Sequence, residues 1–148
     1  MKRRRQILVV DDDDTIRSLL RLVAERRGYS VDVAADGAEA LQRLDECTYD
    51  LAVVDLMMPR VNGYDLVDRM RQIGERPAVV IATAMTDEMI GQLDADVVHS
   101  IVRKPFDIEM IGGLMTEIVA KITAHRETDA LPENVLEFPA TAEPDRVC

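Results

Sequence analysis

Short apolar runs alternate with amphipathic stretches along most of this chain, and this alternation restricts the fold more than any other feature. Each run has the length of a single strand: 7–10, 29–34, 51–54, 78–82 and 100–102. Three of these runs, 7–10, 51–54 and 78–82, contain no polar residue, as strands buried on both faces require. Such strands occur in parallel sheets that helices cover on both sides.

The stretches between these runs have apolar residues at the spacing of amphipathic helices. In the first of them, 15–27, an apolar stripe lies opposite the arginines, and Asp13 or Asp14 is expected to cap its start and Gly28 its end. Further helices are predicted at about 38–47, 64–73, 87–95 and 107–121. The sum predicts an α/β fold with a doubly wound parallel sheet, in which ligands bind at the carboxyl ends of the strands.

Acidic residues directly follow two of the predicted strands. Asp11 and Asp12 come after the first strand and Asp55 after the third. If both strands are central and parallel, the three carboxylates converge at one edge of the sheet, where they repel one another unless a cation lies among them. Oxygen ligands with open coordination positions suit Mg²⁺. For Asp13 and Asp14, the next two acids, capping of the following helix is the favoured interpretation.

A hydroxyl group and an ammonium group follow the last two strands. Thr83 comes after the fourth strand and Lys104, with Pro105 behind it, after the fifth. The Thr83 hydroxyl can hydrogen-bond a phosphoryl oxygen held on a neighbouring strand, and the compact charge of Lys104 can neutralise such oxygens. Pro105 is a candidate for a cis peptide bond. Because a carboxylate is a competent nucleophile toward phosphorus, the whole set predicts phosphoryl transfer onto an acid of this cluster.

These residues stand in stretches that resemble the signature of response-regulator receiver domains of two-component signalling. The matching stretches are ILVVDDD at 7–13, DLMMP at 55–59 with Gly63, TA at 83–84 and KPF at 104–106, within a resemblance that covers about 6–122. The resemblance implies a flavodoxin-like sheet of order 2-1-3-4-5. It also implies individual roles: Asp55 as phosphoacceptor, Asp11, Asp12, Asp55 and the Met57 backbone carbonyl as ligands of Mg²⁺ or Mn²⁺, Thr83 as switch hydroxyl, and Lys104 as partner of the phosphoryl group.

The same resemblance implies a function in signal transmission. A sensor histidine kinase or a histidine phosphotransfer protein would donate the phosphoryl group, and the phosphorylated chain would switch its contacts with a downstream protein that the sequence does not identify. Beyond Mg²⁺-dependent self-phosphorylation and slow autodephosphorylation, no enzymatic activity is expected. The expected contact surface is the fourth helix, fifth strand and fifth helix, whose apolar residues either pair two copies of the chain or pack entirely inward.

The switch position departs from the family pattern, and the residues that border the site bear on dephosphorylation. Three residues before Lys104 the family usually carries an aromatic switch residue, but this chain has Ile101. The coupling of Thr83 to the contact surface is therefore expected to differ. Met57 and Met85, two residues after the phosphoacceptor and the switch hydroxyl, are apolar and cannot hold an attacking water by a hydrogen bond. Unassisted dephosphorylation is accordingly expected to be slow.

Three other interpretations are weaker. Residues 11–15 satisfy the Asp-x-Asp-x-Thr pattern of haloacid-dehalogenase-type phosphatases, but no acidic metal motif follows Lys104, and the stretch at 55–59 stays unexplained. A receiver-shaped interaction module that is never phosphorylated is disfavoured by the intact acid, Thr and Lys set, although Ile101 favours it. A Rossmann-type nucleotide-binding domain would carry a glycine-rich turn after the first strand, and the sequence has none there.

Charge and composition limit the partners and the compartment. The net charge of −10 disfavours direct binding to nucleic acid, and the basic run at 2–5 is interpreted as a solvated lead-in. No stretch has the length of a membrane span, and Cys47 and Cys148 indicate no disulfide framework, so a reduced, cytoplasmic setting is expected. Residues 1–124 are predicted to form the receiver domain and 125–148 an acidic, Pro-containing, flexible tail. The sequence leaves open whether the chain is a stand-alone regulator or a fragment of a larger protein.

Overall fold

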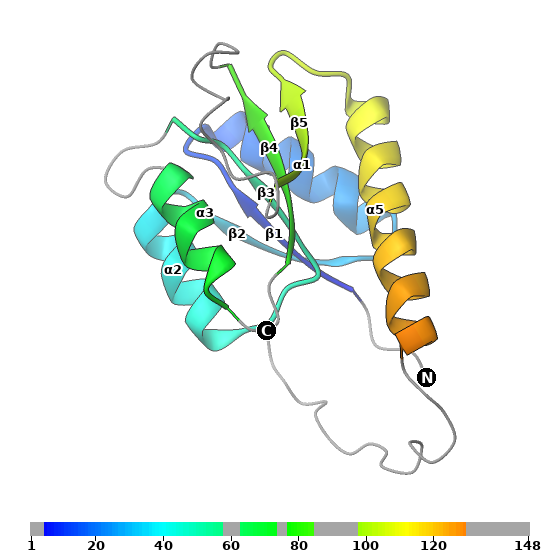
Figure 1. Cartoon of the computed structure of the whole chain (residues 1–148). Coiled ribbons are helices and arrows are strands. Elements are labelled where there is room, and N and C mark those ends of the chain that lie inside the picture. Colours follow the sequence, from blue (N-terminus) through cyan, green and yellow to red (C-terminus); the bar gives the residue numbers. More distant parts are fainter. Residues whose placement is uncertain (1–4, 58–62, 74–76, 85–97, 130–148) are drawn as a thin grey trace.

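The computed structural model describes residues 5–57, 63–73, 77–84 and 98–129. Its centre is a five-stranded sheet (Figure 1) made of β1 (Gln6–Val10), β2 (Ser30–Ala34), β3 (Leu51–Val54), β4 (Ala78–Thr83) and β5 (Val98–Arg103). All neighbouring strands are parallel, and their order is β2-β1-β3-β4-β5. The parallel sheet and the order 2-1-3-4-5 predicted from the sequence are therefore confirmed.

The helices of the described part cover both faces of the sheet, and they are α1 (Asp14–Arg26), α2 (Gly37–Glu46), α3 (Gly63–Arg71) and α5 (Ile108–Asp129). In Figure 1, α2 and α3 lie on one side of the strands, and α1 and α5 lie on the other. Neighbouring residues of one strand belong to opposite hydrophobic cores. Leu8 and Val10 pack with residues of α2 and α3, whereas Ile7 and Val9 pack with residues of α1 and α5. This two-sided burial explains why β1 is apolar throughout.

Local signals explain where α1 begins and ends. The Asp13 carboxylate accepts hydrogen bonds from the backbone N–H groups of Thr15 and Ile16, at 2.9 and 3.2 Å, and so caps the start of the helix. Gly28 follows the last turn with a φ of +90°, a conformation that glycine adopts without the steric penalty of a Cβ. Of the two acids predicted to cap the start, Asp13 is the cap and Asp14 is the first residue of the helix, and the cap predicted at Gly28 is confirmed.

Two elements are longer than the sequence predicts. β5 spans Val98–Arg103 because it is an edge strand of the sheet, where exposed polar residues such as His99 are tolerated. α5 continues to Asp129, beyond the predicted domain end at 124, because residues 125–129 contain neither Gly nor Pro. The first residues assigned to the tail are thus helical, and the domain boundary itself stays a prediction.

Some predictions concern residues outside the described ranges. These are the basic run up to residue 4, the helix at 87–95, the side chain of Met85 and the tail from 130 onward. Cys47 is not a free thiol, contrary to the reduced state expected of it, and Cys148 lies outside the described residues. Among the described helices, none is long and apolar enough to cross a membrane. The cytoplasmic setting stays a prediction.

Candidate functional site

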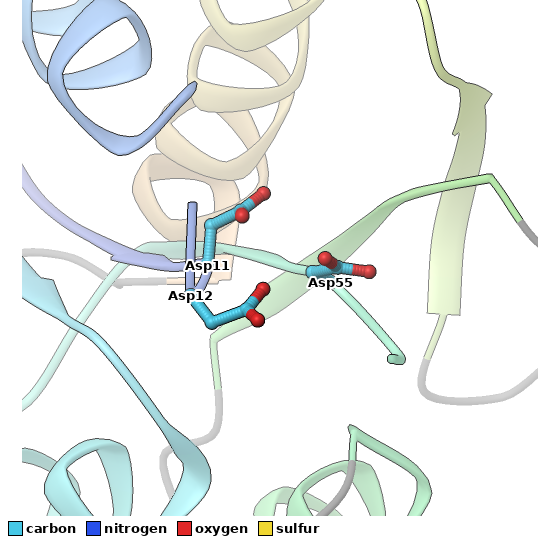
Figure 2. Close-up of side chains that lie close together, drawn as sticks. All are labelled: Asp11, Asp12 and Asp55. Carbon is cyan, nitrogen blue, oxygen red and sulfur yellow. The ribbon is translucent and has the colours of Figure 1, made fainter. Parts of the chain in front are cut away.

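Three carboxylates meet at the carboxyl ends of β1 and β3. Asp11 follows β1 and donates its backbone N–H to the Ala34 carbonyl at 3.1 Å, while Asp55 follows β3 and donates its own to the Val10 carbonyl at 2.9 Å. One carboxylate oxygen from each of Asp11, Asp12 and Asp55 lies within 4.8 Å of the other two. Figure 2 shows the three side chains gathered at this edge of the sheet. The structure thus brings together the three acids that the sequence analysis singles out.

The three acids differ in their exposure to solvent. Asp11 is 1% exposed and Asp55 is 6% exposed, whereas Asp12 is exposed. Buried carboxylates need hydrogen bonds because an unpaired buried charge is strongly destabilising. Oδ1 of Asp11 accepts from the Asp13 backbone N–H at 2.9 Å, and Oδ1 of Asp55 accepts from the Met57 backbone N–H at 3.1 Å. These bonds fix the orientation of both buried carboxylates.

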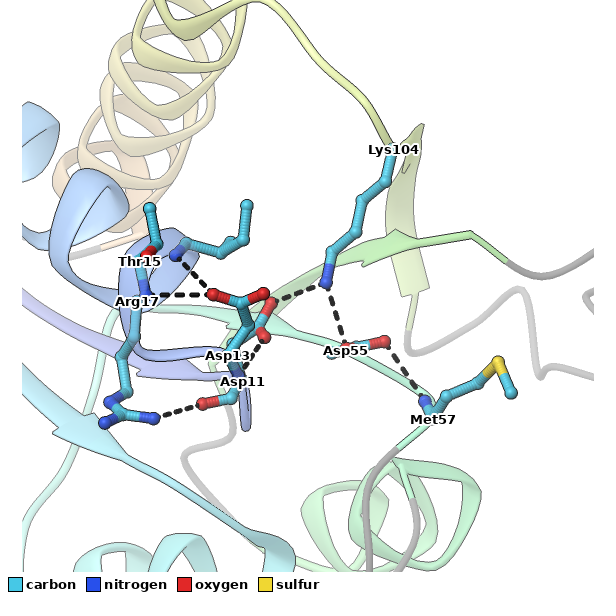
Figure 3. Close-up of polar contacts among 8 residues, drawn as sticks. Asp11, Asp13, Thr15, Arg17, Asp55, Met57 and Lys104 are labelled. Carbon is cyan, nitrogen blue, oxygen red and sulfur yellow. Dashed lines mark hydrogen bonds and ion pairs between the residues drawn. The ribbon is translucent and has the colours of Figure 1, made fainter.

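Lys104 places a positive charge between the two buried acids (Figure 3). Its Nζ donates to Oδ2 of Asp11 at 2.8 Å and to Oδ2 of Asp55 at 3.0 Å. The lysine follows β5, and its backbone N–H donates to the Thr83 carbonyl at 2.9 Å, which extends the pairing of β4 with β5. The peptide bond between Lys104 and Pro105 is cis, in agreement with the sequence.

Burial and the neighbouring opposite charges shift the pKa values of Asp11 and Lys104 in opposite directions. Burial raises the pKa of Asp11, and the hydrogen bonds from Lys104 and from the Asp13 N–H offset only part of that rise. Burial lowers the pKa of Lys104, but its hydrogen bonds to Asp11 and Asp55 and their negative charges outweigh that effect and raise it. The lysine is therefore charged at neutral pH. One ammonium group faces three acids, so the cluster can still attract a further cation.

The donor set of this cluster fits a divalent cation. Carboxylate oxygens that leave coordination positions open to water are the usual ligands of Mg²⁺. Asp11, Asp12 and Asp55 supply such oxygens within reach of one ion. Because Asp12 is exposed, a hydrated ion can approach the cluster from solvent. The Met57 carbonyl, which the family resemblance implies as a further ligand, belongs to the residue whose N–H holds Asp55.

Thr83 and Ile101 lie on the strands beyond β3. Thr83 is the last residue of β4, the neighbour of β3, and it is completely buried. Ile101 pairs with Ile81 in the register of β4 and β5, and it is 41% exposed. Thr83 thus lies at the same edge of the sheet as the carboxylates, while Ile101 is on the outer strand. Their roles as switch residues stay predictions.

One residue beside the site is not singled out by the sequence. Arg17, in α1, donates from Nη1 to the Asp11 carbonyl oxygen at 2.8 Å and forms an ion pair with Asp14. Figure 3 shows its guanidinium group beside that carbonyl. The apolar stripe of α1 indicates only that its arginines lie away from the core. Nothing in the spacing distinguishes Arg17 from Arg21, which pairs with Glu25 on the same helix.

Comparison with known proteins identifies the family of this fold and cluster. The family model of the response regulator receiver domain matches residues 7–115. The chain belongs to this family. The matched segment of the receiver runs from β1 into α5, and it therefore includes the three clustered acids, Thr83 and Lys104.

Individual relatives agree with this assignment. The receiver is 35% identical over 120 residues to the response regulator ArlR of Staphylococcus saprophyticus, an alignment that covers 80% of this chain and 51% of ArlR. The chain spans about half the length of the curated relatives it matches. Among solved structures, TrrA of Thermotoga maritima, in complex with Mg²⁺-BeF, is 28% identical with a TM-score of 0.68, over 77% of this chain and 98% of TrrA. A CheY-like receiver domain protein of Methanospirillum hungatei shares the fold at 20% identity, with a TM-score of 0.78 over 83% of this chain and 99% of that protein.

The family and the geometry both contradict the alternative of a haloacid-dehalogenase-type phosphatase. In that interpretation the Asp-x-Asp-x-Thr pattern makes Asp13 part of the reactive site together with Asp11. In the structure the Asp13 carboxylate caps α1 instead, and the third member of the cluster is Asp55 from the end of β3. The pattern at residues 11–15 is therefore a consequence of a strand end followed by a capped helix.

Proposed function

We propose that this receiver accepts a phosphoryl group on Asp55 in a Mg²⁺-dependent reaction, from a sensor histidine kinase or a histidine phosphotransfer protein. The observation that carries the proposal is the cluster of Asp11, Asp12 and Asp55 with Lys104 at the carboxyl edge of the sheet. TrrA, solved in complex with Mg²⁺-BeF, supports Mg²⁺ as the cation that this receiver binds. The membership in the receiver family supports the phosphoryl donor.

The side chains around Asp55 divide the tasks of the proposed transfer. A carboxylate oxygen of Asp55 bonds to phosphorus while the bond from phosphorus to the donor histidine nitrogen breaks, which yields an aspartyl phosphate and a histidine. A magnesium ion at Asp11, Asp12, Asp55 and the Met57 carbonyl would supply charge neutralisation for the phosphoryl oxygens. The Met57 N–H holds Oδ1 of Asp55 in place, and the ammonium group of Lys104 already lies at Oδ2, from where it can shift to a phosphoryl oxygen.

In this proposal the output is a change of protein contacts. The Thr83 hydroxyl hydrogen-bonds the new phosphoryl group, and the resulting movement at the end of β4 alters β5, where Ile101 is exposed. A downstream protein, or a second copy of the chain, binds the surface of β5 and α5, together with the helix that the sequence predicts at 87–95. We propose a cytoplasmic location, no direct contact with nucleic acid or membrane, and no enzymatic activity beyond self-phosphorylation and slow autodephosphorylation.

Intact-protein mass spectrometry after incubation with Mg²⁺ and acetyl phosphate tests the proposal. We expect the mass of one phosphoryl group to be added to the wild-type protein. The addition should disappear in Asp55→Asn and in a sample treated with a chelator. Asp68→Asn is the matched control, because it makes the same chemical change at an exposed position of α3, and it should be phosphorylated like the wild type.

The same experiment separates the proposal from its main alternative. A receiver-shaped interaction module, which the exposed Ile101 at the switch position favours, would gain no phosphoryl group under any condition. That outcome would make the carboxylate cluster a structural feature only. A phosphoryl group that is gained by Asp55→Asn to the same extent would show that a different residue is the acceptor.

A further inference from the structure

Arg17 connects the acidic loop after β1 with the helix that follows it. Its Nη1 donates to the Asp11 carbonyl oxygen at 2.8 Å (Figure 3). Its Nη2 forms an ion pair with Oδ1 of Asp14. Only 18% of the Arg17 side chain is exposed, although its partner Asp14 is 88% exposed. The guanidinium group is planar, and each of its two terminal nitrogens contacts one end of the loop. It therefore restrains the position of the Asp11 carbonyl relative to Asp14.

Asp12 lies within the segment that Arg17 holds. The side chains on either side are fixed, because Asp11 is bonded to Lys104 and Asp13 caps α1. Within the described part of the chain, the exposed carboxylate of Asp12 has no hydrogen bond of its own. The position of the Asp12 carboxylate therefore depends on the loop backbone. Arg17 restrains that backbone by its hydrogen bond to the Asp11 carbonyl.

We propose that Arg17 is a positioning residue for the metal: it fixes the loop backbone so that the Asp12 carboxylate stays within reach of a cation shared with Asp11 and Asp55. The inference rests on the proposed function, since it takes Mg²⁺ as that cation. It extends the proposed function by assigning to an α1 side chain, which does not touch the ion, control over the affinity of the site. Groups that orient metal ligands commonly change metal affinity by about 10–100-fold when they are lost.

Two effects of Arg17 on a bound cation have opposite signs. Its positive charge repels the ion, so the loss of that charge alone would tighten Mg²⁺ binding. Its hydrogen bond to the Asp11 carbonyl restrains the loop, so the loss of that bond weakens Mg²⁺ binding. The ion pair with Asp14 already neutralises much of the guanidinium charge. Positioning therefore outweighs repulsion, and the sign of the change in affinity distinguishes the two roles.

Isothermal titration of Mg²⁺ into the protein, without a phosphodonor, provides the test. Arg17→Met removes the hydrogen bonds and the charge, and we expect its Kd for Mg²⁺ to rise about tenfold. Arg17→Gln removes the charge but keeps an N–H donor, and its Kd should lie between those of Arg17→Met and the wild type. The matched control is Arg21→Met, which loses the same charge further along α1, where Arg21 pairs with Glu25 in a solvent-exposed contact. Its Kd should be unchanged or slightly lower.

A second readout separates positioning from a general structural defect. The Mg²⁺ concentration for half-maximal phosphorylation by acetyl phosphate should rise in Arg17→Met by the same factor as the Kd, while the rate at saturating Mg²⁺ is retained. A structural defect would instead lower the phosphorylated fraction at every Mg²⁺ concentration. If circular dichroism shows that Arg17→Met is unfolded, Arg17→Gln takes its place in the test. A Kd of Arg17→Gln for Mg²⁺ that equals the Kd of Arg21→Met then overturns the inference.

The outcomes also separate this inference from the proposed function. A wild-type protein that binds no Mg²⁺ and is not phosphorylated contradicts the proposed function. A wild-type protein that binds Mg²⁺ and is phosphorylated, beside a folded Arg17→Met with an unchanged or lower Kd, contradicts only the role of Arg17.

Discussion

Lys104 joins the ends of two strands by contacting both buried acids: its Nζ lies 2.8 Å from Oδ2 of Asp11 and 3.0 Å from Oδ2 of Asp55. All three side chains are largely buried, so solvent screens their charges only weakly. The ammonium group therefore neutralises carboxylates that would otherwise repel each other. A divalent cation at the same cluster would share that role with the lysine.

This relationship predicts that Lys104→Met makes stability depend on Mg²⁺. Removal of the ammonium group leaves two buried carboxylates without their partner, and the free energy of unfolding should fall by about 3 kcal/mol in the absence of metal. Added Mg²⁺ should restore most of that loss and should stabilise the variant more than the wild type. Urea unfolding with and without Mg²⁺ measures both effects.

Lys121→Met is the matched control for this prediction. Lys121 pairs with Glu117 at 3.6 Å on the surface of α5, where both side chains are exposed. Its removal should change the free energy of unfolding by less than about 1 kcal/mol, with the Mg²⁺ response of the wild type. Equal Mg²⁺ responses of Lys104→Met and Lys121→Met would show that the metal and the lysine do not share the same carboxylates.

The apolar side chain of Met57 leads us to expect a long lifetime for the phosphorylated state. Its backbone holds Asp55, but its apolar side chain is 56% exposed and offers no hydrogen bond to an attacking water. Wild-type dephosphorylation should therefore be slow, and Met57→Asn should shorten the phosphoryl half-life by about tenfold, which corresponds to one positioned hydrogen bond. Loss of the phosphoryl group, followed by intact mass after removal of the donor, measures the rate. Met57→Leu should behave like the wild type, and a wild-type half-life of seconds would show that other groups position the water.

The hydrogen bond between Tyr49 and Asp32 predicts a dependence of stability on high pH. Tyr49 is buried, and its hydroxyl donates to Oδ2 of Asp32 at 2.6 Å. Burial, and then the hydrogen bond to Asp32 and its negative charge, raise the pKa of Tyr49 in the folded protein. A raised pKa means that the stabilisation is fully present below the ordinary tyrosine pKa of about 10 and is lost as the pH rises above it.

Tyr49→Phe tests this linkage. At neutral pH the variant should be less stable by about 1–2 kcal/mol, because the hydrogen bond to the Asp32 carboxylate is gone. Between pH 9 and pH 11 (roughly one unit to each side of the tyrosine pKa) the difference from the wild type should shrink, because only the wild type loses the contribution of Tyr49. Tyr29→Phe, on the other face of the sheet, is the control. A gap between Tyr49→Phe and the wild type that stays constant with pH would contradict the assigned cause.

The positions of Asp11, Asp55, Thr83 and Lys104 could be predicted because apolar runs define where strands end, and parallel strands bring their carboxyl ends to one edge. The contacts that these side chains make could not be predicted from the sequence. We expect Lys104 to contact the phosphoryl group of the phosphorylated protein; without that group, its Nζ pairs with the two buried carboxylates, whose charges require a partner. The contact of Arg17 depends on how the loop turns, which helix periodicity does not encode.

The lengths of the last two elements were also not predictable from local patterns. β5 contains polar residues that interrupt its apolar run, and backbone pairing with β4 extends it nevertheless. α5 continues to Asp129 although the apolar face that the sequence shows ends near Ile122. In both β5 and α5, the regular backbone hydrogen bonding extends further along the chain than the apolar residues that pack in the core.

A pair of neighbouring glycines in α5 predicts opposite effects of the same substitution. A Cβ at Gly112 would lie 2.7 Å from Nε of Arg27 and 2.9 Å from Cγ1 of Val23, whereas a Cβ at Gly113 would meet nothing within 4 Å. Alanine is favoured over glycine inside a helix by about 0.5–1 kcal/mol, so Gly113→Ala should stabilise the protein by that amount.

At Gly112 the same gain in helix propensity is opposed by packing. The new methyl group would displace Arg27, which donates from Nη1 to Oγ1 of Thr116 at 3.0 Å, and would press on Val23 in the core. Such overpacking destabilises by about 1–3 kcal/mol, so Gly112→Ala should be less stable than the wild type. Urea unfolding measures the free energy of unfolding of both variants. The gain in helix propensity is the same in both, so the difference between them reports the close packing of α1 against α5 at Gly112. If both alanines stabilise the protein equally, the two helices do not pack as closely as the distances to Gly112 indicate.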